Sequence, residues 1–184
     1  KQLFNGSNTE GWRYQGPQEA FVVEGGCIKA AGPRGNLMFV GNQELSPIMK
    51  DFELTMKVKT EDKANSGVFI HCRRNNDGVS FANGLELQIA NENKDTQKTG
   101  SVWGVQPVND LIVHDGEWFD YRINVRGMTV TTFINGKQVN EWTQPTDWKG
   151  PPGKPDAKLG EGTIGLQSNG GMVWFKDIEI TVLQ

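Results

Sequence analysis

The chain contains 184 residues, of which 36% are hydrophobic and 22% charged, so it is long enough for one domain with a substantial core. No apolar run approaches the roughly 18 residues that a membrane-spanning helix needs. The formal net charge is −3, with Lys and Arg scattered along the chain, and this argues against a nucleic-acid partner.

The regular structure predicted from the sequence is almost entirely β-strand, because no long segment has apolar residues at helical spacing. Residues Phe52–Thr60 alternate between apolar and polar, as a half-buried strand requires. The same alternation runs over residues 121–126, and residues 128–134 return beside them after a turn at Gly127. The other predicted strands are residues 21–23, 27–30, 36–40, 67–73, 85–90, 101–103, 137–139, 162–167 and 173–182.

Short strands separated by Gly-rich turns are typical of a sandwich or barrel. We therefore predict an all-β jelly-roll β-sandwich that forms one domain over residues 1–184. The polar stretches 91–99 and 144–159 are predicted to be loops, which either are solvated connections or carry function. Cys27 and Cys72 either form one bridge or remain as buried free thiols.

Polar side chains on three predicted strands are candidates for a common surface. Side chains two residues apart on a strand share a face, so Glu86 and Gln88 point together, away from their apolar neighbours. By the same rule Gln167 points away from the core, and His71 and Arg73 share a face. If these strands are neighbours, the surface suits a ligand with many hydroxyl groups. The alternative is the ordinary polar outer face of a sandwich.

Tryptophans divide into one candidate ligand contact and several expected core residues. Trp103 follows Glu86 and Gln88 in the sequence, and its indole ring could stack on a sugar ring. Trp12, Trp118 and Trp174 are expected in the core.

Several familiar sites are not supported by the sequence. There is no nucleophile elbow and no evident Ser/His/Asp arrangement. Only two histidines and no clustered cysteines are present, so we expect no metal and no cofactor. A retaining glycosidase needs two carboxyl groups about 5 Å apart, but the strand that carries Glu86 has Gln88 where a second carboxylate would stand.

Motifs spread along the chain resemble the 3-keto-disaccharide hydrolase domain family, a concanavalin A-like lectin/glucanase jelly roll. The resemblance covers nearly the whole length, and it depends on the order and spacing of the motifs together. They are Leu3-Phe4-Asn5-Gly6, Gly11-Trp12, Asp51-Phe52-Glu53-Leu54, Asn65-Ser66-Gly67-Val68-Phe69-Ile70, Glu86-Leu87-Gln88-Ile89, Thr99-Gly100, Trp103-Gly104, Gly116-Glu117-Trp118, Asn135-Gly136, Gly165-Leu166-Gln167 and Phe175-Lys176-Asp177-Ile178.

This resemblance implies a carbohydrate or glycoside ligand and cleavage of 3-keto-glycosides by base-initiated elimination. Such a reaction needs one general base and support for an enolate oxygen. We expect Glu86 or His71 as the base. The expected substrate-binding residues are Arg73, Gln88, Gln167 and Trp103.

The sequence is also compatible with two other functions, a non-catalytic carbohydrate-binding module of the same fold and a structural domain without a small ligand. The resemblance to this family further implies a secreted or periplasmic protein of bacterial origin.

Overall fold

The computed structural model describes residues 1–184, and apart from the 3-10 helix Gln18–Ala20 its regular structure consists of strands. None of its helices has the length and apolar character needed to cross a membrane. The strands are β1 Trp12–Gln15, β2 Phe21–Glu24, β3 Cys27–Ala30, β4 Gly35–Phe39, β5 Phe52–Thr60, β6 Ser66–Arg74, β7 Phe81–Ala82, β8 Leu85–Ile89, β9 Phe119–Arg126, β10 Thr129–Ile134, β11 Lys137–Thr143, β12 Thr163–Ser168 and β13 Val173–Val182.

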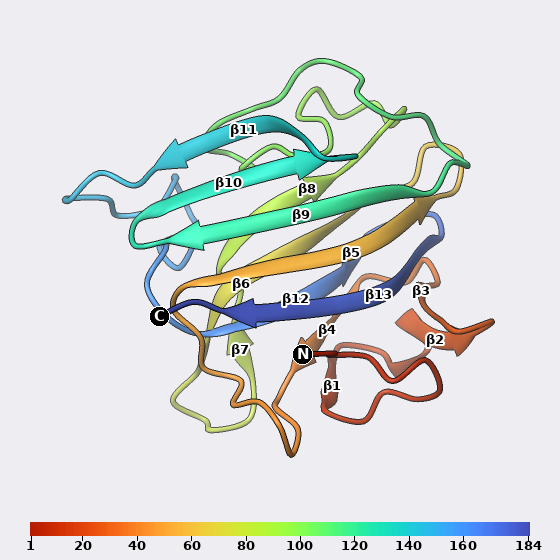
Figure 1. Ribbon diagram of the computed structural model, residues 1–184, viewed down its shortest axis with the longest axis horizontal. Helices are drawn as coiled ribbons and strands as arrows, with labels where there is room; N and C mark the ends of the chain where they lie inside the picture. The colour runs from red at the N-terminus through yellow and green to blue at the C-terminus, as the bar shows by residue number, and fades with distance from the viewer.

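The strands form two antiparallel sheets that pack face to face (Figure 1). The front sheet has the order β11-β10-β9-β5-β13-β3-β2, and the back sheet has the order β1-β4-β12-β6-β7, with β8 also paired to β6. Each sheet also joins strands that are distant in sequence, as in β5 with β13 and β12 with β6. The predicted all-β jelly-roll sandwich is confirmed.

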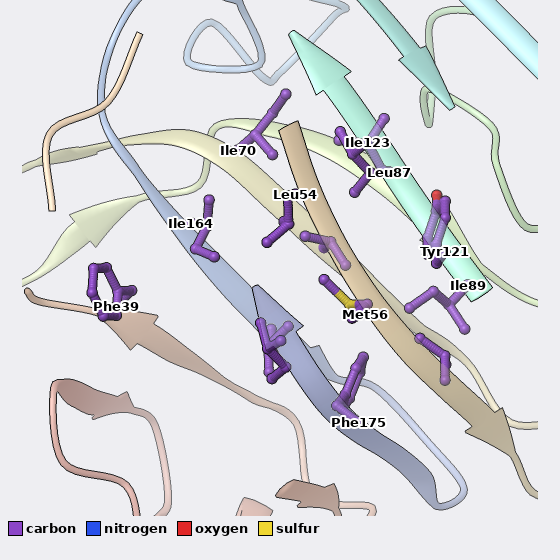
Figure 2. Close-up of a cluster of buried hydrophobic side chains, with 14 of the residues drawn as sticks. Phe39, Leu54, Met56, Ile70, Leu87, Ile89, Tyr121, Ile123, Ile164 and Phe175 are labelled. Atoms are coloured by element: carbon purple, nitrogen blue, oxygen red, sulfur yellow. The ribbon is translucent and has the colours of Figure 1, made fainter. Parts of the chain in front are cut away.

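The apolar faces of the two sheets meet in a common core. Along β5 the residues alternate strictly between buried and half-buried, as the sequence pattern predicts. Figure 2 shows Leu54 and Met56 of β5 between the sheets, close to Ile70 and Leu87 of the back sheet. Cys27 and Cys72 are both buried and free, so the free-thiol alternative is the correct one.

Turn chemistry and strand ends mostly follow the sequence, with local exceptions. Gly127 and the Asn135-Gly136 pair adopt the positive φ angles that tight hairpin turns require. The predicted strand at residues 101–103 is instead a turn with an isolated bridge at Val102. The short strands β1 and β7 were not predicted.

The core assignment of the tryptophans is confirmed for Trp12 only. Trp12 is buried, and its indole N–H donates to the carbonyl of Leu3 at 2.7 Å. Trp118 is 38% exposed and Trp174 is half-buried, both against the ammonium group of Lys59. The core expectation is wrong for these two residues: Trp174 alternates with the buried Val173 and Phe175 and so lies on the outer face of β13, and Trp118 lies just before β9 begins.

A β-bulge in β6 changes which side chains share its outer face. Thr163 pairs with Cys72 and Gly165 pairs with Phe69, so two steps along β12 correspond to three along β6. The additional residue is absorbed at His71, whose φ is 53°. Phe69 and Cys72 consequently lie in the same outer cluster although they are three residues apart.

Candidate functional site

A groove of about 350 Å³ lies on the outer face of the back sheet, covered on one side by the loop 144–159. Strands β6, β8 and β12 contribute Phe69, Glu86 and Gln167, and the short strands β1 and β7 and several loops contribute the rest. The polar and aromatic lining residues are Gln15, Arg34, Phe69, Phe81, Asn83, Glu86, Trp103, Lys154, Asp156 and Gln167.

Glu86 lies on the floor of this groove because β6 provides space for its side chain. Glu86 pairs with Phe69 across the sheet, and its carboxyl group leans along β6 over Gly67. A Cβ atom on Gly67 would lie 2.8 Å from Oε1 of Glu86, so only glycine leaves the carboxyl group this position. The side-chain amide of Gln167, on the other side of β6, interacts with that carboxyl group. Glu86 and Gln167 therefore converge, as predicted.

The surroundings of Glu86 adjust its acidity to neutral pH. Burial raises the pKa of the Glu86 carboxyl group from 4.5 to about 7, because the charged form loses water contacts. Lys154, Gln167 and Arg34 act in the opposite direction and favour the carboxylate. A group with such a pKa can both accept and return a proton at neutral pH.

Trp103 forms an aromatic wall beside Glu86. Its backbone N–H donates to the carbonyl oxygen of Glu86 at 2.9 Å, and the side chains of both residues line the groove. The ammonium group of Lys154 lies 3.6 Å from the centre of that ring. Charge and aromatic surface therefore meet at one point of the groove.

Gln88 supports the groove from behind and does not line it. It is buried, and its amide donates to Oδ2 of Asp95 at 3.0 Å. The same oxygen accepts the indole N–H of Trp103 at 3.3 Å. Gln88 thus fixes the carboxylate that orients Trp103, and the expected direct contact with substrate becomes an indirect one.

Gln167 lines the groove and carries an acceptor that is not used within the chain. Its side chain is 8% exposed, and its Oε1 atom is buried without a hydrogen-bond partner. A buried amide oxygen is costly to leave unpaired, so a hydroxyl group of a ligand would be a favourable partner.

His71 lies outside the groove, because the bulge directs its side chain elsewhere. Its Nδ1 atom accepts the backbone N–H of Gly160 at 3.0 Å, so Nε2 carries the proton and donates to the carbonyl of Lys50 at 2.9 Å. Burial lowers the pKa of His71 to about 4, so the ring is neutral. The expectation that His71 shares a face with Glu86 is wrong, and Glu86 alone remains as the candidate base.

Arg73 is also absent from the groove, which corrects its expected place beside Gln167. The bulge shifts the residues that follow it, and Arg73 lines a separate pocket near the end of β6. In its place the groove takes its positive charge from Arg34 and Lys154. Alternation along strands could not identify them because both lie in loops, although the composition of residues 144–159 marked that loop as a candidate.

No group of three or more His, Cys, Asp or Glu side chains is arranged to hold a metal ion. The chemistry available in the groove is that of one buried carboxyl group, two cationic side chains, an amide and an indole ring.

Comparisons with known proteins agree with a site for sugars. Residues 1–181 match the family model described as a 3-keto-alpha-glucoside-1,2-lyase-like domain. A protein of Bacteroides thetaiotaomicron named 3-keto-disaccharide hydrolase is 29% identical over an alignment of 224 positions, which covers 98% of this chain and 77% of that protein.

Two crystal structures of candidate glycosyl hydrolases from Parabacteroides distasonis have the same fold. One superposes with a TM-score of 0.82 at 23% identity and covers 100% of this chain and 94% of that chain. The other has a TM-score of 0.77 at 28% identity, with 100% and 98% covered.

Proposed function

Because the chain belongs to the family of 3-keto-alpha-glucoside-1,2-lyase-like domains, we propose that it cleaves 3-keto-glycosides by an elimination that Glu86 initiates. The family resemblance expected from the sequence motifs is thereby confirmed, and the chain is a carbohydrate-active, glycosyl hydrolase-like domain. The observation that carries the finer proposal is the Glu86 carboxyl group, which has a pKa of about 7 on the floor of a groove with cationic walls.

One general base is enough for this reaction. The ketone at carbon 3 acidifies the hydrogen at carbon 2, and the carboxylate of Glu86 removes that hydrogen as a proton. The electron pair of the broken C–H bond forms an enolate. When the enolate reverts to the ketone, a double bond forms between carbons 1 and 2, and the bond from carbon 1 to the aglycone oxygen breaks. That oxygen leaves and takes up a proton. Water then adds across the double bond, with its hydroxyl group on carbon 1 and a proton on carbon 2, which completes a net hydrolysis.

The cations of the groove suit the charge that develops in this step. Lys154 and Arg34 both act on the charge of Glu86, so they also stand within electrostatic range of an enolate formed beside it. Lys154 covers one face of the Trp103 ring, so a sugar would contact the part of the indole that Lys154 leaves free, and the unpaired Oε1 of Gln167 suits a hydroxyl group.

An ordinary two-carboxylate hydrolysis is less well supported. Asp156 also lines the groove, from the loop 144–159, but the nearby acidic group that acts on the pKa of Glu86 is Asp95. Asp95 lies behind Trp103 and accepts two hydrogen bonds there, so it is engaged as a support for the aromatic wall.

A chromogenic substrate tests the proposal directly. We expect the protein to release 4-nitrophenol from 4-nitrophenyl 3-keto-glucoside and to leave the ordinary 4-nitrophenyl glucoside intact. Glu86→Gln should lower the rate by about 10² to 10⁴-fold, which is the usual contribution of a general base. Glu117→Gln, an exposed glutamate outside the groove, is the matched control.

Two results would contradict the proposed reaction. Release that persists in Glu86→Gln would exclude Glu86 as the base. Saturable sugar binding without any release would favour the non-catalytic carbohydrate-binding module.

A further inference from the structure

A second pocket lies on the same sheet, near the end of β6, and has a volume of about 250 Å³. Pro47, Ile48 and Phe81 give it apolar walls. Phe81 also lines the groove, so one aromatic ring stands between the two cavities. Ile48 is 66% exposed, which leaves apolar surface open to solvent at the rim.

The guanidinium group of Arg73 reaches this pocket without a partner. Its Nη1 atom is buried and makes no hydrogen bond, and Arg73 takes part in no salt bridge. The backbone leaves room for this side chain, because a Cβ atom on Gly160 would collide with Nη2 of Arg73. Arg73 as a whole is half-buried, and a partly buried charge without a partner is unfavourable, so the site is suited to an acceptor from outside the chain.

The other charged groups at the pocket leave it positive. Arg74 lies over the ring of Phe81, and its Nη1 atom donates to the carbonyl of Gly78 at 2.7 Å. Glu161 is exposed at the rim and forms no ion pair with either arginine. Two cations therefore face one carboxylate.

From these contacts we propose that the pocket binds a small monocarboxylate with an apolar or aromatic body. The carboxylate pairs with the guanidinium group of Arg73, which is the geometry that arginine favours. The body of the ligand packs between Ile48 and Phe81. The site is separate from the groove, so it does not depend on the reaction proposed for Glu86.

The test uses 3-phenylpropanoate as the probe and 3-phenylpropanamide as its uncharged counterpart, both titrated into the full chain by calorimetry. We expect saturable binding of the carboxylate and at least about tenfold weaker binding of the amide, because a hydrogen bond to a charged group is lost. Binding of both compounds with equal affinity, or no saturable binding of the carboxylate, overturns the proposal.

Variants locate the binding site. Arg73→Met keeps the apolar stem and removes the charge, and it should weaken probe binding by at least about tenfold. Arg126→Met, at the end of β9 on the other sheet, is the matched control and should bind the probe as the unmodified chain does.

Glu161→Gln provides a change in the opposite direction. It removes a negative charge at the rim that repels the carboxylate of the probe, so probe binding should become tighter. This variant keeps the proposal testable even if Arg73→Met does not fold. Unchanged affinity in Arg73→Met, or weaker binding in Glu161→Gln, would show that the probe binds elsewhere.

Discussion

At the scale of single residues, the proposed chemistry depends on opposing influences on one carboxyl group. Burial raises the pKa of Glu86 to about 7, while Lys154, Gln167 and Arg34 stabilise its charged form. The same burial that makes Glu86 a stronger base also means that Glu86 is protonated in a fraction of the molecules at neutral pH. The rate of a base-initiated elimination should therefore rise with pH through about 7.

Removing the charge of Lys154 should change this profile in a specific direction. Lys154 lowers the pKa of Glu86, so Lys154→Met should move the midpoint of the pH–rate curve upward. If Lys154 also stabilises the enolate, the plateau rate at high pH should fall by about 10 to 10²-fold. The measurement is the rate of 4-nitrophenol release from the 3-keto-glucoside between pH 5 and 9.

Lys149→Met provides the control for this variant, because Lys149 lies in the same loop but does not line the groove. Its curve should coincide with that of the unmodified chain. A midpoint that moves downward in Lys154→Met would contradict the electrostatic role of Lys154.

At the scale of secondary-structure elements, β6 determines the site through a residue without a side chain. Gly67 lies between β8 and β12, and the carboxyl group of Glu86 occupies the space above it. Gly67→Ala would place a methyl group 2.8 Å from Oε1 of Glu86, and the flexible carboxyl group would have to move. Because the backbone itself need not shift, the cost in stability should stay near 1 kcal/mol or less.

The activity of Gly67→Ala should fall by about 10 to 10²-fold, because a displaced base loses its position relative to the substrate. A double-mutant cycle checks the cause. In the Glu86→Gln background, the alanine should reduce the remaining activity little, since the group that it displaces is no longer a base. Fully multiplicative effects would indicate that Gly67 acts through another part of the groove.

The same elements show how much of the site the sequence could predict. Alternation placed Glu86 and Gln167 on one face, because β8 keeps a regular register beside β6 and Gln167 lies at the end of β12 that is away from the bulge. It failed for His71 and Arg73, because a bulge adds one residue and the pattern of side chains carries no mark of it. It gave no information on Lys154, because the position of a loop residue depends on tertiary packing that strand periodicity does not describe.

At the scale of the whole molecule, two buried titratable groups give the stability opposite dependences on pH. The pKa of Glu86 is about 7 in the folded chain against an ordinary value of 4.5, so its contribution to stability is complete below pH 4.5 and is lost as the pH rises through 7. The pKa of His71 is about 4 against 6.5, so its contribution is complete above pH 6.5 and is lost as the pH falls through 4. Between pH 4.5 and 6.5 these slopes largely cancel.

If either group is replaced by a residue that does not titrate, the stability should show the pH dependence that the other group causes. With Glu86→Gln, the free energy of unfolding should increase by about 2 kcal/mol from pH 5 to pH 7.5, because His71 is then the buried group that titrates in this range. His114 is exposed, and its ion pair with Glu92, which raises its pKa, is present in every variant, so it contributes equally to each of them. With His71→Asn, it should decrease by a similar amount; asparagine is chosen because it tolerates the positive φ at this position. Urea unfolding at both pH values measures this change within each protein, so the destabilisation that each substitution causes at every pH is subtracted.

A free energy of unfolding that does not change with pH in Glu86→Gln would mean that His71 is not held neutral by burial. A flat dependence in His71→Asn would mean that Glu86 keeps its ordinary acidity, and the groove would then lack the base on which the elimination depends.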